Sequence, residues 1–288
     1  MQRPEVKAFF HSPTNTFSYV VWDPATMQAA VIDAVLDYDA APGHIHHESA
    51  DAVIAFVQVE GLDVAWVIDT HVHADHLSAA AYIQSKIGGR LAIGEHIRTV
   101  QRSFGKLFNA GPEFSSDGGQ FDHLFVDGER YMVGSIEATA IYTPGHTPAC
   151  MTHLIGDAAF VGDTLFMPDY GTARCDFPGG DAATLYRSIQ KIFALPDETR
   201  MFLCHDYKAA GRDEFVHETT VAAQRRDNIH VHAGIAQAGF VAMRTKRDAT
   251  LSMPQLILPS VQVNMRAGHL PPAEDNGVRY LKIPLDSM

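Results

Sequence analysis

The segment Thr-His-Val-His-Ala-Asp-His, at residues 70–76, places three imidazoles and one carboxylate within six consecutive positions. It follows an apolar run at residues 64–68, which is too short for a helix and is typical of a buried strand. Side chains two residues apart in an extended segment point the same way, so His71 and His73 can face one ion. Turns use Asn, Gly and Ser for their geometry and have no need of three imidazoles. The pattern therefore predicts a metal site whose candidate ligands are His71, His73, Asp75 and His76.

Three further candidate ligands lie where other predicted strands end. His146 follows strand 136–142 in the turn Thr-Pro-Gly-His-Thr, Asp163 follows strand 159–161, and His205 ends strand 201–204. Taken alone, a residue such as Asp163 is equally compatible with an ordinary turn or helix cap. Metal sites, however, are assembled from loops that a rigid scaffold holds together. We therefore expect these three residues to join the 70–76 cluster.

Strand and helix patterns alternate in both halves of the chain, which fits two β-sheets sandwiched between helices. The predicted strands are 6–10, 17–22, 28–34, 64–68, 91–93, 136–142, 151–154, 159–161 and 201–204, and the predicted helices are 49–59, 77–87, 95–104 and 181–193. Ser49 is the expected N-cap of the first helix. Beyond Arg226 the chain becomes rich in proline. We expect a catalytic domain at 1–226 and a partly irregular extension, 227–288, packed on that domain.

The composition excludes several classes of partner. A net charge of −12 and the lack of a Lys/Arg-rich run argue against binding to nucleic acid or an anionic membrane. No stretch reaches the ~18 apolar residues of a membrane span, and the N-terminus lacks a signal-peptide pattern. Three scattered cysteines are too few for a disulfide framework. These features predict a soluble protein of the cytoplasm with reduced thiols.

Other His and Cys residues could be interpreted as a second metal site or as reactive thiols, but we do not favour these interpretations. His44, His46 and His47 precede a helix in a polar loop without a carboxylate at matching spacing, so we expect them to face solvent. Cys150 and Cys175 lie near the ligand motifs. Such cysteines are more often small buried hydrophobes than reactive thiols.

The order of the candidate ligands resembles that of the metallo-β-lactamase superfamily. The signature HxHxDH, a later His, a later Asp and a last His are matched in order between about residues 6 and 210. The resemblance implies an αββα sandwich of two mixed β-sheets flanked by helices. It does not specify the reaction, because the superfamily contains thioester, lactam, lactone and phosphodiester hydrolases as well as oxidoreductases.

Narrower motifs are similar to those of the persulfide dioxygenase (sulfur dioxygenase) family. These motifs are Gly-Asp-Thr-Leu-Phe at 162–166, Arg-Cys-Asp-Phe at 174–177 and His-Asp-Tyr at 205–207. Glyoxalase II, the sister family, shares the first motif but usually has His-Glu-Tyr in place of the last. The resemblance continues through Lys208, Arg212 and residues 218–220, which favours the dioxygenase.

This resemblance implies that His71, His146 and Asp163 bind one iron(II) ion per chain. Two imidazoles and one carboxylate leave positions open for O₂ and a thiol-type substrate. The remaining motif residues would then orient ligands and water; they are His73, Asp75, His76 and His205. If all seven residues bound metal, Asp163 would bridge two ions and the site would generate hydroxide for hydrolysis.

The implied reaction is oxidation of glutathione persulfide by O₂ to sulfite and glutathione. Glutathione carries two carboxylates, for which Arg174 is the first expected partner and Lys208 and Arg212 are further candidates. Tyr207 and Asp206, which follow the last ligand, are the expected catalytic residues. His230 falls where the family has a downstream arginine. The resemblance also implies a homo-oligomer.

Two alternative functions remain open. The first is a dinuclear zinc hydrolase, either a glyoxalase II acting on a glutathione thioester or another thioesterase or lactonase. Metal identity separates it from a dioxygenase, because zinc has no redox chemistry with which to activate O₂. The second is a non-catalytic member of the fold, which the intact ligand set disfavours.

Overall fold

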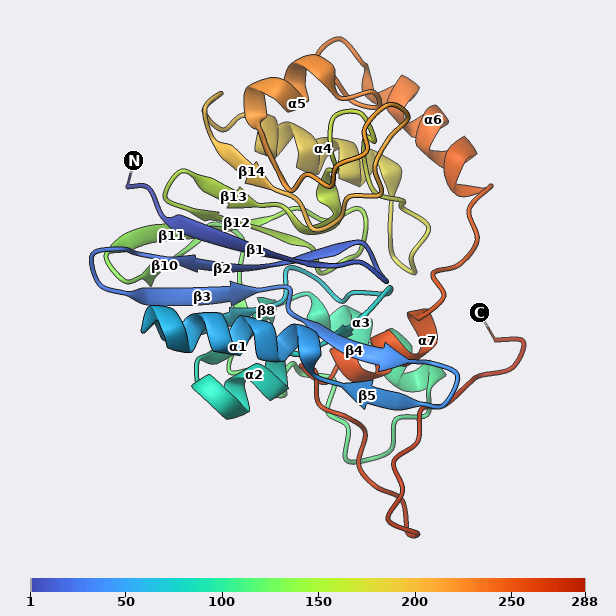
Figure 1. Cartoon of the computed structure of the whole chain (residues 1–288). Helices are drawn as coiled ribbons and strands as arrows, with labels where there is room; N and C mark the ends of the chain where they lie inside the picture. Colours follow the sequence, from blue (N-terminus) through green and yellow to red (C-terminus); the bar gives the residue numbers. More distant parts are fainter. Residues whose placement is uncertain (1, 288) are drawn as a thin grey trace.

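Two six-stranded sheets stack face to face at the centre of the computed structural model, which describes residues 2–287 (Figure 1). The first sheet begins as an antiparallel meander and continues with parallel strands. Its order is β1 (Glu5–His11), β2 (Thr16–Trp22), β3 (Gln28–Ile32), β6 (Asp63–Ile68), β8 (Arg90–Gly94) and β9 (His123–Phe125). Short hairpins join the antiparallel strands at one edge of the sheet, whereas the parallel strands are joined by longer connections that contain helices.

The second sheet is antiparallel except for one parallel pair, β13 with β14. Its order is β10 (Glu129–Val133), β11 (Ile136–Tyr142), β12 (Met151–Ile155), β13 (Ala158–Phe160), β14 (Arg200–Phe202) and β15 (Glu218–Thr220). A small third sheet is formed by β5 (His44–His46), β4 (Val35–Asp39) and β7 (Leu77–Ser78).

Helices cover both outer faces, so the molecule has four layers (Figure 1). The first sheet is covered by α1 (Glu48–Glu60), α2 (Ala80–Ile87), α3 (Ile97–Leu107) and α7 (Ile257–Asn264). The second sheet is covered by α4 (Ala182–Phe193), α5 (Val221–Asp227) and α6 (Gln237–Asp248). The expected αββα sandwich is confirmed.

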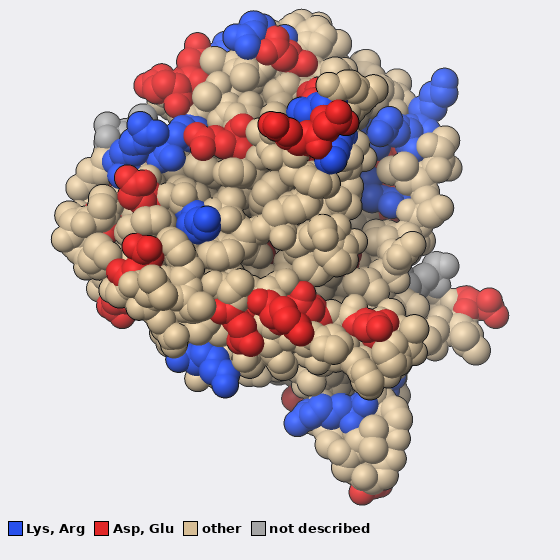
Figure 2. All heavy atoms as spheres, in the orientation of Figure 1, with Lys and Arg blue, Asp and Glu red and all other residues tan. Residues whose placement is uncertain are grey.

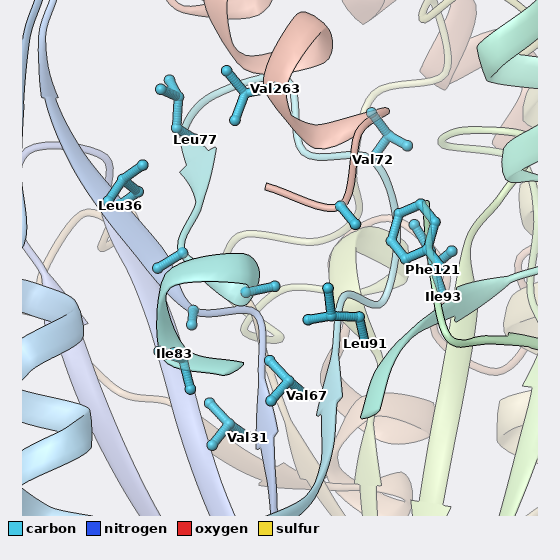
Figure 3. Packing of buried hydrophobic residues seen from close by; sticks show 14 of the residues in the cluster. Val31, Leu36, Val67, Val72, Leu77, Ile83, Leu91, Ile93, Phe121 and Val263 are labelled. Atoms are coloured by element: carbon cyan, nitrogen blue, oxygen red, sulfur yellow. The ribbon is translucent and has the colours of Figure 1, made fainter. Parts of the chain in front are cut away.

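Alternating side chains of the strands divide the apolar residues among three clusters. Tyr19, Ile68 and Phe160 belong to the cluster that fills the space between the sheets. On the other face of the first sheet, Val31, Val67 and Leu91 point toward Ile83 of α2, and Val263 of α7 closes the same cluster (Figure 3). This alternation is what a sheet buried on both faces requires.

Several local predictions differ from the structure. The predicted helix 77–87 begins only at Ala80, because Leu77 and Ser78 pair with β4, a contact from a distant part of the chain. Ser49 does not cap α1. Instead, its backbone N–H and hydroxyl both donate to Asp37, so the cap comes from β4.

The region after Arg226 contains more regular structure than the proline pattern indicated. Helix α6 packs on α4, and α7 packs on β7 and α3. The division of the chain at residue 226 stays a prediction. Within residues 2–287, no helix combines the length and the apolar character that a membrane crossing needs.

Candidate metal centre

The seven candidate ligands meet at one edge of the two sheets. Strands β11, β13 and β14 run in the same direction, because β12 is antiparallel to both β11 and β13 while β13 and β14 are parallel. Their carboxyl ends therefore lie at the same edge, where His146, Asp163 and His205 follow them. Strand β6 of the first sheet brings residues 70–76 to the same place.

Two glycines permit the close approach of these strand ends. Gly145 has a φ of 135°, and a Cβ there would lie 2.3 Å from the backbone N of Leu185 in α4. Gly162 opens the short helix η1 (Gly162–Thr164) at a φ of 50°, and its Cβ would lie 2.5 Å from the hydroxyl of Thr70. Larger residues would therefore separate the turns that carry the ligands.

Asp163 lies between three histidines. Its Oδ2 is 3.6 Å from Nε2 of His146 and 3.9 Å from Nε2 of His71, and its Oδ1 is 3.3 Å from Nε2 of His205. Nε2 of His205 is also 3.5 Å from Oδ2 of Asp75. Four sets of ligand atoms each lie within 4.8 Å of one another: His71 with His146 and Asp163, His73 with Asp75 and His76, Asp163 with Cys204 and His205, and His73 with Asp33 and Asp69.

Each of the five histidines uses one ring nitrogen to reach an oxygen outside the cluster. The partners are Thr70 Oγ1 for His71 (3.0 Å), Asp33 Oδ1 for His73 (3.0 Å), the Leu77 carbonyl for His76 (3.0 Å), the Arg174 carbonyl for His146 (2.8 Å) and the Asn15 carbonyl for His205 (3.2 Å). Such outer hydrogen bonds set the tautomer and leave the second nitrogen as a free acceptor.

The inward-facing atoms fit a bound cation. Nε2 of His71, His76 and His205, Nδ1 of His73 and Oδ1 of Asp163 are all buried without a hydrogen-bond partner. Each buried polar atom left unpaired costs roughly 1–3 kcal/mol, so five at one place indicate a site built for a ligand. Imidazole nitrogens with a carboxylate are suitable donors for iron or zinc.

Electrostatics keep most of the cluster ready for a metal. Burial and the neighbouring histidines hold the pKa of His71 well below its usual range, and burial lowers the pKa of His76 to about 3. Both rings are therefore neutral, as ligands must be. Burial also opposes a charge on His73, but the Asp33 carboxylate outweighs it and raises the pKa of His73 to about 9.

A pocket of about 380 Å³ opens directly onto the metal centre. Asp75, His146 and Asp163 line its inner end. Its walls come from residues 13–15, the aromatic residues Phe166, Tyr170 and Tyr207, the arginines Arg174, Arg244 and Arg247, and residues between Leu251 and Leu256. An apolar pocket with a few convergent polar groups is the usual form of a small-molecule site.

Tyr207, a predicted catalytic residue, and Arg174, a predicted substrate residue, line this pocket. Tyr207 packs its ring on Tyr170, with the ring centroids 5.2 Å apart, and on His205 at 5.5 Å. Arg174 also lines the pocket, but both edges of its guanidinium are taken, by Asp176 at 2.5 and 2.6 Å and by the Ser252 carbonyl at 2.6 Å.

Asp206, Lys208 and Arg212 do not line the pocket. The buried Asp206 carboxylate binds the Arg212 guanidinium and accepts hydrogen bonds from the backbone N–H groups of Lys208 and Val216, at 2.9 and 2.7 Å. The Lys208 ammonium lies over the Phe215 ring. The expected catalytic role of Asp206 and substrate role of Arg212 are therefore revised. The pair holds the loop that presents His205 and Tyr207.

Sequence reasoning missed four residues at the site. Asp33 holds His73, and Asn264 holds the 70–76 loop from α7. Arg244 and Arg247 reach the pocket from α6. Two of the missed positions carry a sequence signal. Asp33 follows a strand, as the candidate ligands do, and the oppositely charged residues Arg244 and Asp248 have the i,i+4 spacing of a helix. Asn264 has no comparable signal.

His230, Cys150 and Cys175 contribute packing rather than ligands, whereas the Cys204 thiol lies within 4.8 Å of ligand atoms of Asp163 and His205. Nδ1 of the buried His230 accepts a hydrogen bond from the backbone N–H of Thr172 at 3.0 Å. Cys150, Cys175 and Cys204 are buried and unpaired, and burial raises the pKa of Cys150 to about 12. The expectation that Cys150 and Cys175 are buried is confirmed. His44 and His46 are exposed, although they lie in β5 rather than a loop, whereas His47 is half-buried and packs on the Tyr82 ring.

Known proteins resemble this chain along nearly its whole length. Residues 11–205 match the family described as the metallo-beta-lactamase superfamily. A probable metallo-hydrolase of Burkholderia pseudomallei (strain 1710b) is 56% identical and covers 98% of this chain and 99% of its own. Glyoxylase B2 of Dictyostelium discoideum is 45% identical over 99% and 98%. The mitochondrial persulfide dioxygenase ETHE1 of Homo sapiens is 28% identical over 91% and 88%.

The solved structures agree in fold. The crystal structure of ETHE1 from Myxococcus xanthus is 30% identical, has a TM-score of 0.72 and covers 92% of this chain and 100% of its own. The chain spans 66% of a longer relative, the beta-lactamase hydrolase-like protein of Xylella fastidiosa (strain Temecula1 / ATCC 700964), to which it is 50% identical. With this fold, these aligned relatives and the match over residues 11–205, the chain belongs to the metallo-β-lactamase superfamily.

Proposed function

We propose that this chain is a glutathione-dependent persulfide dioxygenase with one iron(II) ion per chain. The observation that carries the proposal is the group formed by His71, His146 and Asp163, whose ligand atoms lie within 4.8 Å of one another. His146 and Asp163 of this group also line the pocket. Two histidines and one carboxylate on one face of an ion are typical of non-haem iron sites that react with O₂.

Iron(II) held by these residues would supply the redox chemistry that activates O₂ toward sulfur. The balanced reaction takes glutathione persulfide, O₂ and water to glutathione, sulfite and two protons. The protein orients His71 through the Thr70 hydroxyl and His146 through the Arg174 carbonyl, and its aromatic wall keeps bulk water from the reacting sulfur. Tyr207, whose side chain is at the pocket, would orient the substrate.

Relatives support this proposal without deciding it. Human ETHE1 is named a persulfide dioxygenase, and the solved ETHE1 from Myxococcus xanthus shares the fold at 30% identity. The motifs at 174–177 and 205–207 point the same way. The more similar relatives carry the names metallo-hydrolase and Glyoxylase B2.

A dinuclear zinc hydrolase is the second candidate function. The observation that favours it is the set of buried, unpartnered atoms beyond the first three ligands, namely Nδ1 of His73 and Nε2 of His76 and His205. With Asp75 and Oδ1 of Asp163, these atoms would suffice to hold a second ion, and a pair of metal ions would supply a hydroxide nucleophile.

Metal analysis of protein purified without oxygen tests both candidates. We expect about one iron per chain, O₂ uptake on addition of glutathione persulfide, and release of sulfite. Two zinc ions per chain, no O₂ uptake and turnover of a glutathione thioester would overturn the dioxygenase and support the hydrolase.

The proposal also includes a cellular compartment and an oligomeric state. Three buried, unpaired thiols suit a reducing, cytoplasm-like compartment, where glutathione is also available. A homo-oligomer is proposed from the family resemblance alone, and its size is testable by sedimentation of the purified protein.

A further inference from the structure

Three arginines line the pocket of the metal centre, and two of them are already neutralised. Arg174 is bound on both edges by Asp176 and the Ser252 carbonyl. Arg244 is only 1% exposed, and its guanidinium pairs with Asp248 at 2.6 and 2.8 Å and donates to the Thr172 carbonyl at 3.1 Å. Neither arginine offers a free charge to an incoming anion.

Arg247 is different. It is exposed at the rim of the same pocket, and within residues 2–287 its side chain forms no ion pair or hydrogen bond. Residues 244, 247, 248 and 251 share one face of α6 and of the turn that follows it, because they are separated by three and four positions. Figure 2 shows Lys and Arg atoms gathered over α6, although the chain as a whole carries a charge of −12.

The position of Arg247 is fixed relative to the metal centre. Asp248 accepts a hydrogen bond from the backbone N–H of Cys175 at 2.9 Å, and Arg244 donates to the Thr172 carbonyl, so α6 is attached to the 172–175 loop. In the same 172–175 loop, the carbonyl of Arg174 accepts a hydrogen bond from Nδ1 of His146. The helix that carries Arg247 and the ligand His146 therefore share one rigid connection.

We propose that Arg247 forms a carboxylate subsite of this pocket, which selects a thiol-type substrate that bears a carboxylate at a distance from its sulfur. The inference rests on the proposed function and deepens it, because it assigns the recognition of glutathione to Arg247 rather than to Arg174, Lys208 or Arg212. His146, Asp163 and Arg247 line one cavity, so a single ligand can reach both ends. An anion entering beside the carboxylates of Asp75 and Asp163 needs such a cation.

The test compares two variants of equal charge. Arg247→Gln removes the proposed contact, whereas Lys246→Gln removes a charge from the neighbouring exposed residue, which does not line the pocket. Binding of glutathione to the metal-loaded protein is measured by calorimetry. We expect the Kd to rise about tenfold for Arg247→Gln, as for loss of a charge-assisted hydrogen bond, and less than twofold for Lys246→Gln. Circular dichroism confirms that both variants fold.

A ligand without carboxylates completes the test. Glutathione diethyl ester should bind the wild type about tenfold more weakly than glutathione does, and Arg247→Gln should add no further loss. Equal loss in the two variants, or an equal effect of Arg247→Gln on the ester and on glutathione, would overturn the subsite.

Turnover separates this inference from the proposed function. Arg247→Gln should raise KM about tenfold with little change in kcat for whichever substrate the wild type uses, glutathione persulfide or a glutathione thioester. If only the thioester is turned over, the proposed dioxygenase activity is wrong. The KM for the thioester still tests whether Arg247 binds the substrate carboxylate. An unchanged KM on the active substrate would reject the subsite alone, and a wild type that binds no glutathione would reject both.

Discussion

The side-chain amide of Asn264 donates to the carbonyl oxygen of His76 at 2.8 Å, joining two residues that are 188 positions apart. The same amide donates to the His73 carbonyl at 2.8 Å, and its oxygen accepts from the backbone N–H of Ser78 at 2.7 Å. All three bonds are buried. Helix α7, near the end of the chain, therefore shapes the loop that presents the candidate ligands of residues 71–76.

Asn264→Ala should weaken both the fold and the metal site. The substitution leaves three buried backbone groups unpaired, so we expect the free energy of unfolding to fall by about 3 kcal/mol. Metal affinity should fall by at least tenfold, because the carbonyls of His73 and His76 lose their anchor. Urea unfolding and metal titration measure the two effects. Asn276→Ala, which removes an exposed amide bound to Tyr280, is the control and should leave both unchanged.

Asp33→Asn tests the residue that orients His73. Asp33 accepts hydrogen bonds from His73 Nε2, the backbone N–H of Thr70 and the Thr70 hydroxyl, at 3.0, 2.7 and 2.9 Å. Its φ of 52° is one that Asn tolerates, so the backbone is not strained by the change. We expect a 10- to 100-fold loss of metal affinity, measured by competition with a chelator.

The control for Asp33→Asn is a carboxylate with similar bonding that lies far from the ligands. Asp23 follows the carboxyl end of β2, whereas Thr16, at the start of the same strand, contacts His205. Asp23→Asn should leave metal affinity unchanged. If it reduced the affinity as much as Asp33→Asn does, the effect would be general destabilisation and not orientation of His73.

Asp23 should also make stability depend on pH in the acid range. It accepts hydrogen bonds from the backbone N–H groups of Ser135 and Ala25 and from the hydroxyls of Ser135 and Thr26, at 2.7 to 2.9 Å. The Ser135 N–H above all lowers the pKa of Asp23 from 3.8 to about 2. Because the folded pKa is the lower one, this stabilisation is complete above about pH 4 and is lost as the pH falls through about 2.

Urea unfolding of the wild type and Asp23→Asn between pH 2 and 6 measures this contribution. The difference in unfolding free energy between the two proteins should be constant above pH 4 and should shrink below it. A difference that stays constant down to pH 2 would show that the carboxylate charge contributes no stability.

Local pattern predicted nine of the twelve strands of the two large sheets but not β9, β10 or β15, which are short or at sheet edges. It also located the seven candidate ligands, because each follows a strand whose apolar residues reveal it. Long-range contacts explain what was missed. Leu77 was assigned to a helix, since its pairing with β4 is invisible in the local sequence. The roles of Asn264 and Arg247 depend on where α6 and α7 pack. Asp206 pairs with Arg212, whereas the next residue, Tyr207, lines the pocket, and the local sequence does not reveal this difference.

His76→Asn and His146→Asn together distinguish one metal ion from two. If the proposed iron site is mononuclear, His146→Asn removes one of its three ligands and should abolish metal binding, so that metal analysis finds well under 0.2 ions per chain, an order-of-magnitude expectation for a site with a missing ligand. His76→Asn should retain about one ion per chain and a reduced O₂ uptake, because Nε2 of His76 belongs to the other group of donors. A wild type with two ions that loses one in each variant would instead identify the dinuclear centre, and with it the hydrolase.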